Sequence, residues 1–288
     1  MPGVTLVSDT THYLPRELVT AQDIHEVSLY VNEGDRTTRE SDMPDFGEFY
    51  DRLVKTSELP TTSQPSIGDF LAVYEPLLDA GQDIVSVHMT GGISGTVESA
   101  RQAAHDALQS RPDRRIEVID SRSAAGGLGL VVLAGAAKAK AGGDVDAVTE
   151  RVNAAIGSNR IWFAVDTLEF LRRGGRIGTA QAWLGGALQI KPILTVDHLI
   201  EPVERVRTWG RAFQRMVDYA HERKADGATA WAVQHIRAPE EAEKLAARAT
   251  EIFGHEPEFF SEVGPVLGTH AGPGMLGFAG IPPELLGP

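Results

Sequence analysis

The chain has 288 residues, of which 42% are hydrophobic and 23% are charged. These values are ordinary for a globular protein and exclude a disordered, collagenous or membrane-embedded chain. The 27 basic and 40 acidic residues give a net charge of -13, which repels phosphate backbones, so no nucleic-acid partner is expected. The chain contains no cysteine, which excludes disulfides, thiolate catalysis and zinc sites built on sulfur.

The length predicts two packed domains. The glycine pair at 142–143 and the helical pattern after it place a domain joint near residue 155. This joint divides the chain into an N-terminal α/β domain, 1–155, and a C-terminal α/β domain, 156–288. The N-terminus lacks the pattern of a secretory signal, and the longest uncharged apolar segment, 124–137, is shorter than the ~20 residues that span a bilayer. We therefore expect a cytoplasmic protein with no integral membrane segment.

Strands and helices alternate along the first half of the chain. Apolar runs predict strands at 4–8, 26–31, 84–89 and 116–119. Helices are predicted from Pro15, over 45–55, from a cap at Ser66 to Leu78, and over 96–108, whereas 61–66 is predicted to be a loop. Three strand, loop and helix units in a row predict an α/β fold whose mostly parallel sheet is covered by helices on both faces.

Two predicted helices, 123–141 and 144–158, separate this sheet from a second set of strands. The strands of the second set are predicted at 161–165, 192–196, 229–234 and 259–263. The last 25 residues combine prolines and glycines with apolar side chains, and we expect them to form a tail wrapped around the protein.

A glycine-rich turn, MTGGISGT at 89–96, joins a predicted strand to a predicted helix. Backbone N–H groups at Ser94, Gly95 and Thr96 would point past the carboxyl edge of the sheet and form a seat for an anion, to which the Ser94 hydroxyl adds a donor. The alternative is that Ser94 or Thr96 only caps the helix.

Two further loops and one basic segment carry polar groups. TTSQPS lies at 61–66, and GTHAGPG at 268–274 places His270 between glycines that let a ligand approach the backbone closely. LRRGGRIG at 171–178 holds three arginines in an acidic protein: Arg172, Arg173 and Arg176. They form either a patch that docks a partner or a solvated turn whose arginines pair with nearby acids.

Five motifs resemble those of the DegV family in order and spacing, over essentially the whole chain. They are TSQPS, ISGTVESA, VIDSRSA, EFLRRGGRIG and GTHAGPG. The resemblance extends to the fatty-acid-binding subunits of bacterial fatty acid kinase. It implies a two-domain α/β fold that holds one long-chain fatty acid between its domains, needs no cofactor or metal, and presents the acid to a separate ATP-dependent kinase subunit. The kinase forms the acyl phosphate for phospholipid synthesis, so the protein is expected to be a carrier and not an enzyme.

The same resemblance assigns the site. The family's carboxylate-binding residues correspond to Thr62, Ser94 and His270, with Ser63 and Gly95 beside them in the same motifs. The three arginines of LRRGGRIG would then face the kinase. This chain departs from the usual pattern in TGGISGTV at 90–97 and in VSDTT at 7–11, which affects the expected shape of the acyl tunnel more than the ligand class.

Elementary energetics fit a fatty acid ligand. A carboxylate drawn out of water needs several donors, which hydroxyls, loop N–H groups and an imidazole can supply. An acyl chain of about 14 methylenes contributes roughly 11 kcal/mol of transfer free energy, whereas one polar contact contributes about 1 to 3 kcal/mol. The acyl chain is therefore expected to set the affinity, and the polar residues the orientation.

Two other function classes are alternatives. An acyl hydrolase or transferase would use Ser94 as nucleophile and His270 as base, with Asp9 or Asp120 as the orienting acid. The segment GGISGT is not a GxSxG nucleophile elbow, because Thr96 stands two positions after the serine. A phosphate- or nucleotide-binding protein would carry a Walker or GxGxxG motif, and neither is present.

Overall fold

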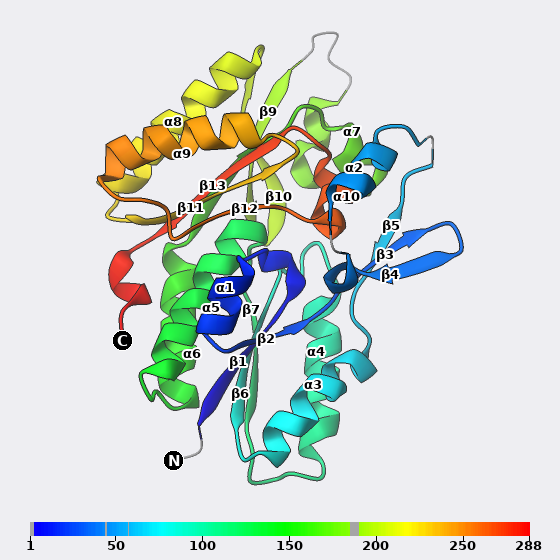
Figure 1. Cartoon of the computed structure of the whole chain (residues 1–288), viewed down its shortest axis with the longest axis vertical. Coiled ribbons are helices and arrows are strands. Elements are labelled where there is room, and N and C mark those ends of the chain that lie inside the picture. Colours follow the sequence, from blue (N-terminus) through cyan, green and yellow to red (C-terminus); the bar gives the residue numbers. More distant parts are fainter. Residues whose placement is uncertain (1–2, 44, 57, 185–189) are drawn as a thin grey trace.

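The computed structural model describes residues 3–43, 45–56, 58–184 and 190–288, and Figure 1 shows their arrangement. The described residues contain three sheets. The first sheet has, in spatial order, β2 (Ile24–Val27), β1 (Val4–Asp9), β6 (Asp83–His88) and β7 (Ile116–Asp120). All three of its pairings are parallel, which confirms the expected parallel sheet.

Helices cover both faces of the first sheet (Figure 1). They are α1 (Arg16–Ala21), α3 (Ile67–Asp79), α4 (Thr96–Leu108), α5 (Ala125–Lys140) and α6 (Val145–Ser158). Because side chains alternate along a strand, Val7 and Ile84 pack with α3 and α4, whereas Leu6 and Val85 face α5 and α6. Ser66 is the N-cap of α3, as the sequence predicts, and a capping box also joins it to Asp69.

The second sheet is mixed and mostly antiparallel. Its strands, in spatial order, are β10 (Leu199–Val206), β9 (Lys191–Asp197), β8 (Arg160–Ala164), β13 (Met275–Ile281), β11 (Ala230–Ile236) and β12 (Phe259–Glu262). Only the pairing of β11 with β12 is parallel. The helices α8 (Trp209–Ala225) and α9 (Pro239–Phe253) pack on the outer face of this sheet, as Figure 1 shows.

The helix α5 lies between the two larger sheets. It contacts β1 of the first sheet and both β11 and β13 of the second. Every residue over 125–136 is buried, which explains why this helix is apolar all round instead of amphipathic. No helix of the described residues is both long and apolar enough to cross a membrane.

A third, small sheet projects beside the first. It is antiparallel, in the order β4 (Arg36–Arg39), β3 (Tyr30–Glu33) and β5 (Thr61–Ser63). Next to it lie α2 (Gly47–Leu53), α7 (Glu169–Arg173) and α10 (Pro265–Ala271). The remaining elements are short 3-10 helices: η1 (Thr10–His12), η2 (Glu40–Asp42), η3 (Gly178–Trp183) and η4 (Pro283–Leu286).

The structure corrects three expectations. The segment 26–31, expected as one strand, divides between β2 and β3, which belong to different sheets. The segment 61–66 is not wholly a loop, because β5 pairs with β3. The last 25 residues are not a wrapped tail, since β13 pairs with β8 and β11 in the interior of the second sheet. The domain joint near 155 stays a prediction, and that position falls within α6.

Candidate functional site

A cavity of about 990 Å³, part of it open to solvent, lies where the two larger sheets and α5 meet. Its wall comes mainly from apolar residues of β8, β11, β13 and α5. Polar side chains from β5, α10, β11 and the loops contribute the rest, and they include the following residues: Thr62, Ser63, Gln64, Ser94, Arg176, Gln234 and His270. A concave, mostly apolar site with a few polar groups is typical of ligand pockets.

The closest contact between these polar groups joins Thr62 to His270. The hydroxyl oxygen of Thr62 lies 2.8 Å from Nε2 of His270. Thr62 is placed by the pairing of β5 with β3, where it stands opposite Val31, and His270 is placed by α10. The structure therefore brings together two residues that the sequence could connect only through motifs.

The imidazole of His270 is neutral at neutral pH. Burial, with a smaller contribution from the charge of Arg176, lowers the pKa of His270 to about 4. Its Nδ1 is buried and has no hydrogen-bond partner among the described residues. One ring nitrogen of a neutral imidazole carries a proton, so His270 can donate one hydrogen bond but supplies no full positive charge.

Ser94 lies in the turn between β6 and α4. Its Oγ is 2.8 Å from the hydroxyl oxygen of Thr96 and accepts a bond of 3.3 Å from the Thr96 N–H. The N-cap of α4 is Gly95 and not Ser94 or Thr96, and Ser94 accepts from the first N–H of the helix. Both Ser94 and Gly95 also line the cavity. A side chain at Gly92 would overlap the carbonyl oxygen of His198, so this turn packs directly against the β9–β10 turn.

The three arginines of the basic segment separate in the structure. Arg172 is exposed and pairs with Glu169 at 2.6 Å, and Arg173 is exposed on the same helix, α7. Arg176 instead lines the cavity, where it donates to the carbonyl oxygens of Ile93 at 3.3 Å and Gly174 at 2.9 Å. Arg176 is therefore a fixed positive charge beside His270, in a position that the expectation of kinase docking did not include.

The two acids considered for a hydrolase make other contacts. Asp9 is fully buried and accepts bonds from Nδ1 of His88 at 3.1 Å and from the Met89 N–H at 2.9 Å. Asp120 accepts a bond from the Gly91 N–H at 3.1 Å. Neither carboxylate is hydrogen-bonded to His270 in the described part of the chain, so neither orients its ring.

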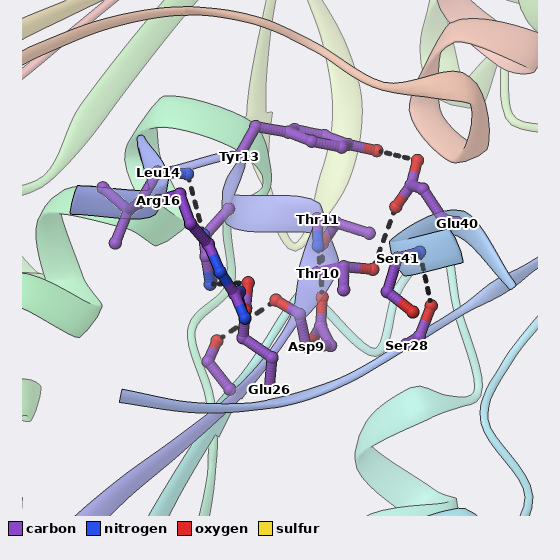
Figure 2. A network of polar contacts seen from close by, with 12 residues as sticks. Asp9, Thr10, Thr11, Tyr13, Leu14, Arg16, Glu26, Ser28, Glu40 and Ser41 are labelled. Carbon is purple, nitrogen blue, oxygen red and sulfur yellow. Dashed lines mark hydrogen bonds and ion pairs between the residues drawn. The ribbon is translucent and has the colours of Figure 1, made fainter. Parts of the chain in front are cut away.

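Glu40, which no sequence motif indicates, supports the site by holding the helix that carries His270. Glu40 is 2% exposed, and it accepts bonds from the hydroxyls of Tyr13 and Thr10, both at 2.9 Å, as Figure 2 shows. It also accepts a bond of 2.8 Å from the Val266 N–H in the first turn of α10. Burial raises the pKa of Glu40 to about 7. Glu40 thus fixes the helix that carries His270.

Comparisons with known proteins agree with this architecture. The family described as "Uncharacterised protein, DegV family" matches residues 3–282. The DegV domain-containing protein SCO2569 of Streptomyces coelicolor is 40% identical over 278 residues, which cover 95% of this chain and 96% of that protein. Protein DegV of Bacillus subtilis is 36% identical over 281 residues, covering 96% and 98% of the two chains.

Two solved structures have the same fold. DegV from Bacillus subtilis, described as a fatty acid binding protein, has a TM-score of 0.87 at 33% identity and covers 98% of this chain and 100% of its own. A DegV family protein from Thermus thermophilus, described by its fatty acid binding, has a TM-score of 0.85 at 32% identity, with coverages of 97% and 99%. The family match and these relatives establish that the chain is a member of the DegV family.

Proposed function

We propose that this protein binds one long-chain fatty acid in the cavity, with the carboxylate near Thr62, Ser94 and His270 and the acyl chain along the apolar wall. The observation that carries the proposal is the cavity itself, which is apolar over most of its surface and has the Thr62–His270 contact at its polar end. The fatty acid binding described for the Bacillus subtilis and Thermus thermophilus proteins supports the same ligand.

The polar end offers an anion both hydrogen-bond donors and one positive charge. Thr62 and the neutral His270 together keep one free donor, because their mutual hydrogen bond uses one of their two protons. The hydroxyl of Ser94 can donate as well, and Arg176 adds a positive charge nearby. Ser63 and Gly95 line the same end of the cavity. Hydrogen bonds to a carboxylate oxygen are roughly twice as strong as those between neutral groups. A few of them can therefore offset the cost of removing the carboxylate from water.

The proposal includes a partner. The carboxylate would be presented to a separate ATP-dependent fatty acid kinase, which would form the acyl phosphate, and the exposed arginines Arg172 and Arg173 would contribute to docking. The helix α7 carries one acid, Glu169, which pairs with Arg172, and two exposed arginines, so on an acidic protein it has a net positive charge that can attract an acidic partner surface. The protein would remain a carrier, located in the cytoplasm.

The geometry gives less support to an acyl hydrolase. A general base works best when its pKa lies near the working pH, whereas the pKa of His270 is lowered to about 4. The imidazole also has no carboxylate partner among the described residues, because Asp9 and Asp120 bond elsewhere.

Native mass spectrometry and lipid extraction of the purified protein test the ligand, and titration of the delipidated protein with stearic acid gives the affinity. We expect a bound species of fatty acid mass and saturable binding of one acid per chain. Acyl ester hydrolysis by the same protein is measured in parallel over a range of pH. If the protein instead carries no fatty acid and hydrolyses esters at a rate that depends on His270, it is a hydrolase and not a carrier.

A further inference from the structure

A groove adjoins the polar end of the cavity. It measures about 550 Å³, part of it open to solvent, and lies between the turn before α4, the turn after α7 and the first residues of β10. Ile93, Arg176 and Ile200 line both the groove and the cavity. Ile93 directly precedes Ser94, and the charge of Arg176 contributes to the lowered pKa of His270. The groove therefore meets the cavity where the carboxylate is proposed to lie.

Two glycines let the walls of the groove approach one another closely. An added Cβ at Gly92 would stand 2.0 Å from the carbonyl oxygen of His198, and one at Gly178 would stand 2.0 Å from that of Ile200. Gly178 also has a φ of +56°, a conformation that favours glycine. Both turns thus rest directly on the backbone at the β9–β10 turn and the start of β10, so backbone contacts fix the position of the groove.

Arg176 supplies the charge of the groove. None of the other lining residues that the structure describes is charged. The guanidinium donates through Nε to the carbonyl of Ile93 and through Nη1 to that of Gly174. Its Nη2 makes no hydrogen bond to the described residues and is not one of their buried unpartnered atoms, so it is accessible. On a protein with a net charge of -13, Arg176 offers a held cation with a free donor edge.

An acyl phosphate needs a space of this kind. In the proposed reaction the kinase transfers the terminal phosphoryl group of ATP to a carboxylate oxygen, so that a P–O bond forms as the bond to ADP breaks. The new phosphate is bonded to the carboxylate oxygen and must lie beside the polar end while the acyl chain stays in the apolar part of the cavity. The groove adjoins that end, and a guanidinium is well suited to phosphate oxygens.

We infer that the groove is a phosphate subsite, which holds the phosphate of a long-chain acyl phosphate with Arg176 as its cationic donor while the acyl chain occupies the cavity. The inference rests on the proposed function and goes beyond it, because the protein then binds the product of the kinase as well as the fatty acid. Arg176 serves both head groups, so its removal would weaken both ligands and would not separate them.

Competition binding to the delipidated full chain tests the inference with two probes. One is stearic acid, and the other is the phosphonate in which a methylene replaces the bridging oxygen of stearoyl phosphate, so that it does not hydrolyse. The measured quantity is the ratio of the stearic acid Kd to the phosphonate Kd. In the wild type we expect the phosphonate to bind at least as tightly as stearic acid, because Arg176 pairs with its additional charge.

Leu199 offers matched variants, since it lines the groove but not the cavity and is 39% exposed. Leu199→Glu places a negative charge beside the phosphate and should lower the ratio by about ten-fold, whereas Leu199→Lys should raise it by roughly three-fold to ten-fold. Leu199→Gln has the shape of glutamate without its charge and should keep the wild-type ratio. Inorganic phosphate should displace the phosphonate only at millimolar concentration, because it lacks the acyl chain.

The outcomes separate the two proposals. If the wild type binds stearic acid but the ratio is the same in Leu199→Glu, Leu199→Lys and Leu199→Gln, the inference is overturned and the fatty acid function stands. Wild-type binding of the phosphonate about a hundred-fold weaker than that of stearic acid overturns it as well, and so does displacement by micromolar inorganic phosphate, which would indicate a site for free anions. If the wild type binds neither probe, the proposed function fails, and the inference with it.

Discussion

Thr62 and His270 are 208 positions apart in the chain, yet Oγ1 of one lies 2.8 Å from Nε2 of the other. Neither residue belongs to the two larger sheets. Thr62 depends on the register of β5 against β3, and His270 on the short helix α10. The start of α10 is held from two sides, because Tyr50 donates to the carbonyl of Val263 at 2.6 Å and Glu40 accepts from the Val266 N–H. The site therefore depends on long-range contacts.

The first prediction concerns the seat of the carboxylate. Thr62→Ala removes one donor from a half-buried position, so we expect fatty acid affinity to fall by about ten-fold or more, as loss of a hydrogen bond to a charged group predicts. The melting temperature should change little. Ser94→Ala should act in the same way. The measurements are Kd and thermal unfolding of each variant.

Two variants serve as controls for this prediction. Thr62→Ser keeps the hydroxyl and should retain most of the affinity, whereas Thr37→Ala on β4, the strand on the far side of β3, should bind like the wild type. If Thr62→Ala and Ser94→Ala both bind stearic acid with wild-type affinity, the carboxylate lies elsewhere.

The second prediction concerns the charge state of His270. Its pKa is about 4 in the folded protein against 6.5 as a model value, so as pH falls from 6.5 to 4 the unfolded chain takes up a proton that the folded chain does not. Stability should therefore decrease over this window, by on the order of 3 kcal/mol from this residue. In His270→Gln this part of the pH dependence should be absent. Urea unfolding at several pH values measures it, and identical pH profiles for both proteins would contradict it.

Local patterns in the sequence predict much of the first sheet and its helices. Apolar runs followed by capped helices need no distant partner to be recognised, as the capping box of Ser66 and Asp69 shows. The strand β13 was missed because MLGFAGI lies among prolines and glycines and carries no polar alternation. It is a strand because β8 and β11 pair with it on both sides and helices cover both faces of the sheet.

The site residues also divide into those that a local sequence pattern indicates and those that only the fold reveals. Motifs point to Thr62, Ser94 and His270, but no local signal marks Glu40. Glu40 stands in a polar stretch, and its partners Tyr13, Thr10 and Val266 lie 27, 30 and 226 positions away. Such residues become distinctive only when the fold buries them, since burial and partners are tertiary properties.

The third prediction concerns Glu40, whose effect on the pH dependence of stability is opposite to that of His270. The folded pKa is about 7 against a model value of 4.5, so between these values the folded protein holds a proton that the unfolded chain releases. Stability should fall as pH rises through this window, by on the order of 3 kcal/mol. Glu40→Gln can keep its acceptor for the Val266 N–H and donate to Oγ1 of Thr10, so it should not show this loss.

Urea unfolding of wild type and Glu40→Gln at pH 5 and pH 8 measures the difference. The exposed substitution Glu98→Gln controls for the change in net charge and should follow the wild type. If the free energy of unfolding changes equally from pH 5 to pH 8 in the wild type and in Glu40→Gln, Glu40 does not titrate in this range.

The fourth prediction concerns the width of the cavity. Gly277 lines it, and an added Cβ would meet its nearest neighbour, Sδ of Met275, at 3.5 Å, an ordinary contact. Gly277→Ala should therefore fold with wild-type stability and narrow the cavity. We expect weaker binding of bulky or bent acyl chains relative to straight ones, by about three-fold to ten-fold in the ratio of Kd values. A panel of saturated, cis-unsaturated and branched acids measures this, and an unchanged order of preference would place the acyl chain away from Gly277.

The last prediction separates the arginines of the basic segment. Arg173 is exposed on α7, whereas Arg176 lines the cavity close enough to His270 to lower its pKa. Arg173→Ala should therefore keep fatty acid affinity within about two-fold and slow acyl phosphate formation by a cognate kinase. The defect should become smaller at high salt, because screening weakens the wild-type attraction.

Arg176→Ala should instead weaken fatty acid binding itself, by about ten-fold, since it removes the positive charge nearest the carboxylate. Kd values and kinase rates for both variants at two salt concentrations measure these effects. Loss of fatty acid binding in Arg173→Ala would place that residue at the ligand and remove the basis for docking.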